Sequence, residues 1–207
     1  MNDSLTALIA IALAAFVFIP IVYGLWMLKV NILNPDGRGC EKKTARTLKR
    51  FALLRGFKVF SDVQFSHKGI EFHVENMLVG HFGILMINTL GGRGAYYGQL
   101  DGKTWQFVTD KKRESLPNLA TLQDDTIMAL RGVLSQNKVY SVPMEALIVL
   151  TNRSKKTQMH ITNDGRIFLP GKLKPYLDKT KFEKDAGVDI GKIAEVIGQI
   201  AKDYCTL

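Results

Sequence analysis

The sequence has little cysteine and lacks the motifs of several common enzyme classes. Its 207 residues include only Cys40 and Cys205, which are too few for a disulfide framework, and no Cys-x-x-Cys pair offers a zinc or thiol-exchange site. We therefore expect two reduced thiols in a reducing compartment. The absence of Gly-x-Ser-x-Gly and His-Glu-x-x-His elements removes the usual signatures of α/β-hydrolases and zinc proteases. The Gly-rich run at 91–94 does not continue into Gly-Lys-Ser/Thr, so we interpret it as a tight turn and not as a phosphate-binding loop.

Charged residues are missing from a long stretch near the N-terminus. Between Leu5 and Leu28 there is no Asp, Glu, Lys or Arg. As a helix this stretch is about 36 Å long, which exceeds the ~30 Å hydrocarbon core of a bilayer. A cleaved signal peptide would begin with basic residues and have a shorter apolar stretch. We therefore expect one transmembrane helix within residues 1–30, followed by a turn-rich linker at 31–36.

Acidic residues are scarce in the remainder of the chain. Beyond Leu28 there are 28 basic and 18 acidic side chains, a net charge of +10. Because basic residues follow the apolar stretch and none precedes it, the positive-inside rule predicts an N-terminus outside the cell membrane and a cytoplasmic domain. Such a charge favours two anionic partners, the lipid bilayer and nucleic acid, either DNA or RNA.

Three basic clusters are candidates for contacts with these partners. The first follows the predicted anchor directly, and we assign it to the lipid surface. The other two lie on predicted loops and are the candidate nucleic-acid-binding residues. The clusters are, in order, Lys42, Lys43, Arg46, Lys49 and Arg50; Lys111, Lys112 and Arg113; and Arg153, Lys155 and Lys156.

Hydrophobic periodicity predicts one α/β domain over residues 37–207. Hydrophobic residues make up 46% of the chain, a globular composition. Spacing of three and four residues indicates helices, and alternating or continuous apolar runs indicate strands. We expect helices at 41–56, 118–134, 171–177 and 190–204. We expect a hairpin of strands 58–65 and 70–79, a buried strand at 83–89, a second hairpin of 96–100 and 103–108, and strands at 144–150 and 166–169.

The middle of the chain resembles the NERD (nuclease-related domain) family. The stretch from Val74 to Gly98 is similar to the family's Ile-Asp-His strand, its apolar strand ending in Glu-Thr-Lys, and the Gly-containing hairpin that follows. Gly37 to Glu41 resembles the family's Gly-x-x-Gly-Glu helix start. Trp105 stands where the family often has Trp, and Pro117-Asn118-Leu119 with Gln123 resembles its Asn-Pro-Leu-x-x-Gln helix. Over residues 37–150 the resemblance implies a restriction-endonuclease-like mixed sheet flanked by helices, of the PD-(D/E)xK superfamily.

The resemblance also implies a catalytic site, and this sequence departs from it. Such a nuclease uses carboxylates to bind Mg²⁺ or Mn²⁺, and a Lys beside them. Glu41 matches the helix glutamate, and Glu75 stands in place of the family's Asp. Asn88 replaces the Glu of the Glu-x-Lys element, and Leu90 replaces its Lys. An amide is a poor Mg²⁺ ligand, and leucine carries no charge and donates no hydrogen bond. Glu41 and Glu75 are therefore the remnant catalytic and metal-binding candidates.

A relocated site is an alternative to a lost one. Glu71, His73 and Glu75 alternate along one predicted strand and share a face. With Glu41 they are a candidate metal site, and Lys103 or Arg93 is a candidate cation. The same residues also suit a solvated hairpin face, and an acid in the first turn of a helix is stabilised by the helix dipole without any metal.

These patterns lead to one expected function and two alternatives. We expect a membrane-anchored NERD-like domain that binds nucleic acid or acts as a scaffold, is not an enzyme, and needs no metal or small-molecule cofactor. The first alternative is a nuclease that uses Mg²⁺ or Mn²⁺ at the relocated site. The second is a module that binds other proteins and no nucleic acid.

Overall fold

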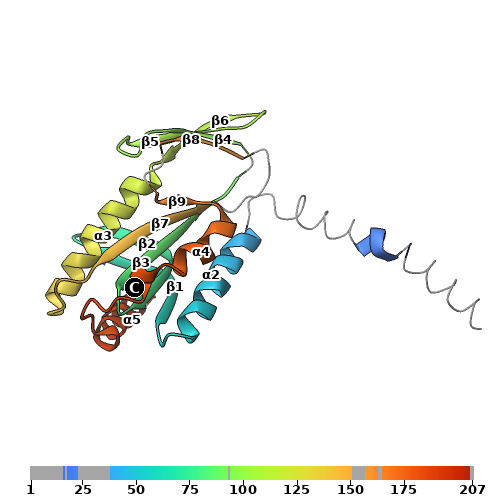
Figure 1. The fold of residues 1–207 in the computed structure, drawn as a ribbon. Helices are drawn as coiled ribbons and strands as arrows, with labels where there is room; N and C mark the ends of the chain where they lie inside the picture. Colours follow the sequence, from blue (N-terminus) through green and yellow to red (C-terminus); the bar gives the residue numbers. More distant parts are fainter. Residues whose placement is uncertain are drawn as a thin grey trace, which may run out of the picture. The chain divides into compact units, whose positions relative to one another are not determined.

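The computed structural model of the protein describes residues 16, 18–22, 38–92, 94–150, 157–162 and 165–205. The chain divides into two compact units, Met1–Asp36 and Gly37–Leu207. In the first unit, residues 18–22 are helical (Figure 1). Most of the predicted anchor and the whole 31–36 linker fall outside the described residues. Within the part of the chain that the structure describes, no helix is both long and apolar enough to span a membrane.

The second unit contains two mixed β-sheets and the helices that pack against them (Figure 1). The main sheet has the strand order β1-β2-β3-β7-β9, and the small sheet has the order β6-β5-β4-β8. The main elements are α2 (Arg38–Leu53), β1 (Lys58–His67), β2 (Ile70–Gly80), β3 (Gly83–Leu90), β4 (Ala95–Gly98), β5 (Thr104–Val108), β6 (Arg113–Pro117), α3 (Leu119–Gln136), β7 (Met144–Leu150), β8 (Gln158–Ile161), β9 (Ile167–Phe168), α4 (Leu173–Leu177) and α5 (Ile190–Cys205).

The main sheet is covered by helices on both faces. Strands β1, β2 and β3 are antiparallel, whereas β3, β7 and β9 are parallel. Helices α2 and α4 cover one face, and α3 and α5 cover the other (Figure 1). Leu48 and Phe51 of α2 pack with α4 residues, while Leu130 of α3 packs with Ile193 of α5. Each such side chain stabilises the fold by about 1.5–3 kcal/mol when fully buried. A mixed sheet flanked by helices, as expected from the sequence, is confirmed.

Strand β3 lies at the centre of the main sheet, which explains its continuous apolar sequence. Leu85 and Ile87 belong to the core beneath α2 and α4, while Ile84 and Met86 belong to the core beneath α3 and α5. A strand buried on both faces has no solvent-facing positions that would favour polar residues. The predicted buried strand at 83–89 is confirmed.

The small sheet closes the end of the main sheet with its inner face. Tyr96, Trp105 and Phe107 are buried in a third core, together with Leu90 and Ile148 of the main sheet. Burial raises the pKa of Tyr96 to about 12, and its hydroxyl donates a hydrogen bond to the Gly91 carbonyl. The small sheet is therefore part of the same hydrophobic structure as the main sheet.

Asn118 ties the start of α3 to the small sheet. Its Oδ1 accepts hydrogen bonds from the N–H groups of Ala120 at 2.9 Å and Thr121 at 3.4 Å, which caps the helix. Its Nδ2 donates to the carbonyls of Leu100 at 2.7 Å and Gly102 at 2.5 Å in the β4–β5 turn. One side chain thus satisfies the helix N-terminus and holds the turn of the neighbouring hairpin.

The structure corrects the prediction in several places. Helix α2 runs from Arg38 to Leu53, whereas the prediction was 41–56. Strand β6 was not predicted, and Arg113 opens it and does not lie on a loop. Strand β8 was not predicted, because its four residues carry little sequence pattern and its parallel pairing with β4 joins distant parts of the chain. Both predicted hairpins, β1–β2 and β4–β5, are confirmed.

Candidate functional site

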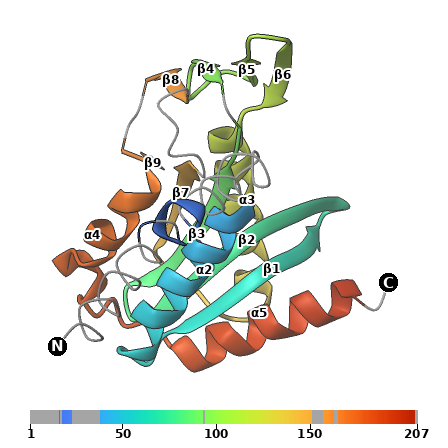
Figure 2. The same ribbon diagram turned by 90° about the vertical axis from the view of Figure 1, so that its right-hand side faces the viewer.

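Strands β2 and β3 separate at the positions that the resemblance assigns to metal-binding carboxylates. The last β2–β3 pair is Asn76 with Ile87, so Glu75 and Asn88 stand opposite each other one step further along these described strands. Side chains join the strands there. Glu75 Oε2 accepts hydrogen bonds from Thr89 N at 3.0 Å and from Thr89 Oγ1 at 2.6 Å. Figure 2 shows the paired β1 and β2 running on beyond β3.

Next to Glu75, the side chains of β1 and β2 no longer alternate regularly between the two faces of the sheet. Asp62 has a φ of 58°, in the left-handed region that few residues other than glycine adopt. On a regular strand, residues three apart face opposite sides. However, Val74 and Met77 both pack into the core beneath α3 and α5. The break therefore changes where the side chains of Asp62 and Glu75 point, compared with an uninterrupted hairpin.

Leu90 occupies the position that the resemblance gives to a catalytic lysine. It lies two residues beyond Asn88 and therefore on the same face of β3. Its side chain is only 8% exposed and belongs to the apolar core that contains Tyr96 and Phe107. This part of the fold is built to hold an apolar side chain, and a lysine ammonium there would have to leave water.

The N-terminal part of α2 lies beside Glu75. Lys42 and Ala45 of α2 line a hollow of about 420 Å³ together with His73, Glu75 and neighbouring residues of β1. Glu41 precedes Lys42 on the helix, but its side chain lies outside the described residues. That Glu41 and Glu75 converge on one site therefore stays a prediction.

Asp62, which no sequence motif singled out, forms a close pair with His73 in this hollow. His73 Nε2 lies 2.7 Å from Asp62 Oδ1, and both side chains are exposed. No motif or spacing pointed to Asp62, because only the backbone break at this residue directs its carboxylate toward β2. The hollow thus combines Asp62, His73 and Glu75.

A larger groove lies between β2 and α3. This β2–α3 groove has a volume of about 700 Å³ and is lined on one side by Glu71, His73, Glu75 and Asn88. Three exposed apolar side chains, Ile70, Leu122 and Met128, also line it. The remaining lining residues are His67, Lys68, Phe72, Leu119, Gln123, Asp125, Thr126 and Ala129. Glu71, Glu75 and Asp125 against Lys68 make its charge acidic, which is unfavourable for phosphate.

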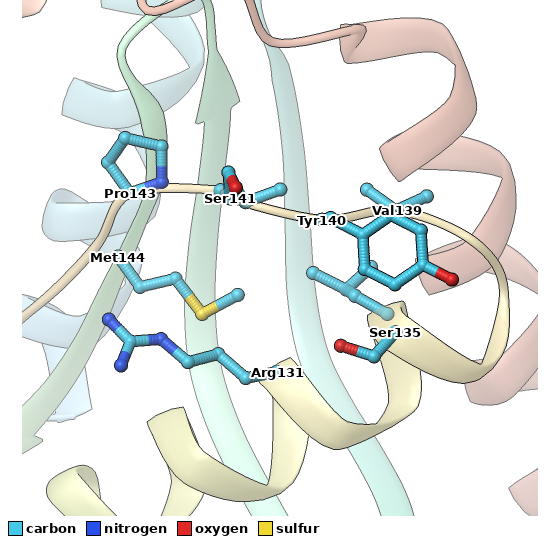
Figure 3. A pocket seen from close by; sticks show the side chains of 9 residues that line it. Arg131, Ser135, Val139, Tyr140, Ser141, Pro143 and Met144 are labelled. Carbon is cyan, nitrogen blue, oxygen red and sulfur yellow. The ribbon is translucent and has the colours of Figure 1, made fainter.

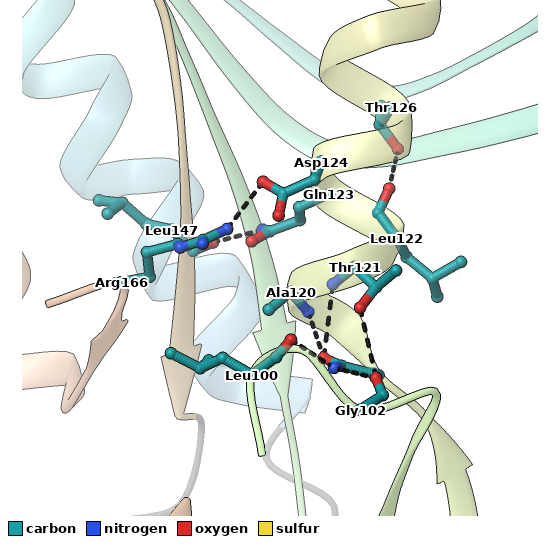
Figure 4. A network of polar contacts seen from close by, with 11 residues as sticks. Leu100, Gly102, Ala120, Thr121, Leu122, Gln123, Asp124, Thr126, Leu147 and Arg166 are labelled. Atoms are coloured by element: carbon teal, nitrogen blue, oxygen red, sulfur yellow. Dashed lines mark hydrogen bonds and ion pairs between the residues drawn. The ribbon is translucent and has the colours of Figure 1, made fainter. Parts of the chain in front are cut away.

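Gln123, the glutamine of the family-like helix motif, joins α3 to the main sheet. Its side chain is 3% exposed, and Nε2 donates to the Leu147 carbonyl at 2.8 Å (Figure 4). Its Oε1 has no hydrogen-bond partner among the described residues. Asp124, the next residue, pairs with Arg166 at 2.7 Å. These contacts fix the helix wall of the β2–α3 groove.

The described donors around Glu75 do not match a metal site of the implied kind. Among the side chains that the structure describes, no group of three or more His, Cys, Asp or Glu residues is placed to hold a metal ion. Opposite Glu75 stands the neutral amide of Asn88, whereas Mg²⁺ and Mn²⁺ favour several carboxylate oxygens in octahedral geometry.

Of the two candidate nucleic-acid-binding clusters, the structure places the first. Lys111 and Lys112 lie at the exposed turn between β5 and β6, and Arg113 follows as the first residue of β6. Lys112 Nζ pairs with Glu114 at 2.6 Å. The second cluster, Arg153, Lys155 and Lys156, falls outside the described residues. In sequence it lies just before β8, so that both clusters adjoin strands of the small sheet.

A separate pocket of about 370 Å³ lies at the C-terminal end of α3 (Figure 3). Arg131 and Ser135 of α3 face Tyr140 and Ser141 of the following connection across it. The residues that line it include none of the candidate catalytic positions. The pocket therefore belongs to the α3–β7 connection and not to the candidate site.

One protein-family model matches the chain. The model of the nuclease-related domain, NERD, matches residues 36–151, which is more than half of the chain. No curated protein and no solved structure matches the chain. The matched range contains α2, β1 to β7 and α3, and so includes both the β2–β3 separation and most of the small sheet.

Proposed function

Because the chain belongs to the nuclease-related domain family, we propose that it binds nucleic acid at a domain whose cleavage site has been lost. Membership of this family supports a role related to nucleic acid. The charge of +10 beyond the apolar segment supports binding to phosphate. The chemistry at β2 and β3 supports the loss of cleavage.

The observation that carries the proposal is the apolar burial of Leu90. Phosphodiester cleavage needs positive charge near the phosphate and an activated water. At the Glu-x-Lys positions, Asn88 supplies an amide and Leu90 is packed into a hydrophobic core. The substitution thus fits the surrounding packing, and a simple return to lysine would place a charge among apolar side chains.

The hydrogen bonds of Glu75 support the same proposal. Its Oε2 accepts hydrogen bonds from the Thr89 N–H and hydroxyl groups, at the point where the backbone pairing of β2 and β3 ends. A carboxylate in this arrangement has a structural use, because it replaces the missing strand pairing. An acidic side chain at this position therefore needs no catalytic explanation.

The experiment uses the full chain in detergent micelles with labelled DNA and RNA. We expect affinity that falls as salt concentration rises, since phosphate binding releases counterions. We expect no cleavage with either Mg²⁺ or Mn²⁺. Salt-independent or absent binding would remove nucleic acid as the partner, and cleavage abolished by Glu75→Gln would show that the site is active.

The hollow beside Glu75 favours one second candidate, a nuclease with a relocated site. Asp62 and His73 form a close pair there, and Glu75 lines the same hollow. Because the described side chains alone hold no metal site, this candidate requires Glu41 as a further ligand, and it predicts cleavage that depends on divalent metal and disappears in both His73→Ala and Asp62→Asn. Glu71→Gln is a suitable control, since Glu71 lines the β2–α3 groove and is absent from the hollow's lining.

We also propose that the apolar segment holds the domain at the cytoplasmic face of the cell membrane. The uncharged stretch from Leu5 to Leu28 and the basic residues that follow it support this arrangement. Protease treatment of intact cells and of inverted vesicles measures the topology. Digestion of the domain in intact cells would contradict the proposed orientation.

A further inference from the structure

The outer face of the small sheet presents one row of polar and aromatic side chains across all four strands. In β6, β5, β4 and β8 respectively, Ser115 pairs with Gln106, Gln106 pairs with Tyr97, and Tyr97 pairs with His160. Residues directly paired in a sheet project from the same face. The inner face holds buried Tyr96, Trp105 and Phe107, so the row faces away from the core.

Two aromatic rings in this row form a parallel stack at the surface. The ring centroids of Tyr97 and His160 are 4.6 Å apart, and their planes differ by only 8°. Tyr97 is 40% exposed and His160 is also exposed. The pair contributes little to the core, and an aromatic group that remains accessible is available to a flat ligand.

The chemistry around the stack fits nucleic acid. Gln106 and Ser115 continue the row with hydrogen-bond donors and acceptors suited to base edges. Lys111 and Arg113 stand exposed at the β5–β6 end of the sheet. Aromatic rings beside basic side chains are how many proteins hold single-stranded nucleic acid, because unpaired bases stack on rings while the cations meet phosphates.

The β2–α3 groove and the outer face of the small sheet differ in charge, and this difference favours the outer face as the binding surface for a nucleic-acid strand. The β2–α3 groove carries Glu71, Glu75 and Asp125 against Lys68, which repels phosphate. The small sheet's outer face has no acidic residue in its Ser115–Gln106–Tyr97–His160 row. A duplex conceals the faces of its bases, so the stacked rings favour a single strand.

We propose that the outer face of the small sheet binds single-stranded nucleic acid, with an unpaired base stacked on the Tyr97–His160 pair. This inference rests on the proposed nucleic-acid-binding function and assigns it to a surface outside the β2–α3 groove. Gln106 contacts the base edge, and Lys111 and Arg113 contact phosphates.

The test measures fluorescence anisotropy of the full chain in detergent micelles with labelled oligothymidylate, oligouridylate and a matched DNA duplex. We expect tighter binding to single strands than to the duplex. We expect Tyr97→Ala to weaken single-strand binding about tenfold or more, because it removes the stacking contribution. Tyr97→Phe should bind like the original chain, since it keeps the ring.

Tyr140→Ala is the matched control, because Tyr140 is 66% exposed on the α3–β7 connection and lies outside the small sheet. Circular dichroism of each variant checks that it is folded. If the original chain binds single strands and Tyr97→Ala binds equally well, the inference is wrong while the proposed function stands. Preference for the duplex would also overturn the inference. If the original chain binds no nucleic acid, the proposed function itself fails.

Discussion

The β2–α3 groove and the outer face of the small sheet belong to one compact unit, yet they suit different ligands. The groove contains Glu75 and Asn88, the positions implied for cleavage, but its lining is acidic and apolar. The outer face has stacked rings, amide and hydroxyl groups, and basic residues at one end. The proposed function therefore assigns the lost cleavage chemistry to one region and nucleic-acid binding to the other.

The largest expected effect comes from removing the support beneath the outer face. Trp105 is fully buried on the inner face, and its Nε1 donates to the Gln99 carbonyl at 3.0 Å. Trp105→Ala should lower the free energy of unfolding by about 3–5 kcal/mol, because it leaves a cavity. Urea denaturation measures this change. A decrease below about 1 kcal/mol would show that the inner face is not tightly packed.

Asn118→Ala should have the next largest effect, because Asn118 joins α3, which lines the groove, to the β4–β5 turn of the small sheet. The change removes the α3 cap and the donors to Leu100 and Gly102. We expect the free energy of unfolding to fall by about 2 kcal/mol in urea denaturation. Asn118→Ser keeps a capping oxygen and should recover about half of that stability. Equal stability of both variants would show that the cap contributes little.

Charge changes should distinguish the surfaces by their effect on binding. Lys111→Gln combined with Arg113→Gln should weaken oligothymidylate binding several-fold and reduce the salt slope by about 0.7 for each phosphate that is no longer neutralised. Lys68→Gln is the control, since Lys68 lines the β2–α3 groove. Anisotropy measured over a salt series gives both values. A larger effect of Lys68→Gln would indicate that the nucleic-acid strand binds in the β2–α3 groove.

The smallest expected difference is the contribution of a single buried phenol, Tyr96, to stability at alkaline pH. The pKa of Tyr96 is raised by burial from 10.0 to about 12 in the folded state. Below pH 10 both folded and unfolded chains keep this proton, so its full contribution to stability is present. As the pH rises from 10 to 12 the unfolded chain loses the proton first, and stability decreases.

Tyr96→Phe should remove part of this alkaline decrease, as measured by urea denaturation at pH 9 and pH 11. The rest of the alkaline decrease comes from other tyrosines, including Tyr176. Burial raises the pKa of Tyr176, and so do its hydrogen bond to Glu145 and the negative charge of Glu145. An unchanged dependence on pH in Tyr96→Phe would show that Tyr96 is accessible to water in the folded protein.

Strong local patterns allowed much of the main sheet to be predicted. The β1–β2 hairpin has Ser66 to Gly69 as a turn signal, and Lys68 and Gly69 do adopt positive φ values. β3 was predicted because its burial on both faces leaves a continuous apolar run. The family was recognised from motifs around these elements, and the family match over residues 36–151 confirms it.

The candidate site was predictable only in part. Asn88 and Leu90 were identified from their positions in a motif, and that they replace catalytic residues stays a prediction. Asp62 was missed, because its backbone conformation arises from the fit of β1 against β2. The Tyr97–His160 stack was missed for a similar reason, since His160 lies on β8, a strand that pairs with β4 across a long stretch of chain.

The order of residues along the chain was enough to establish which segments are apolar, where turns occur, which charges the domain carries and which family it resembles. These properties depend on side-chain chemistry and on spacing. Three features emerged only when the chain was folded: Leu90 supports a hydrophobic core, Glu75 bridges two separating strands, and Tyr97 meets His160 on an open face. Those contacts join residues distant in sequence, and the packing of whole elements, not local preference, selects them.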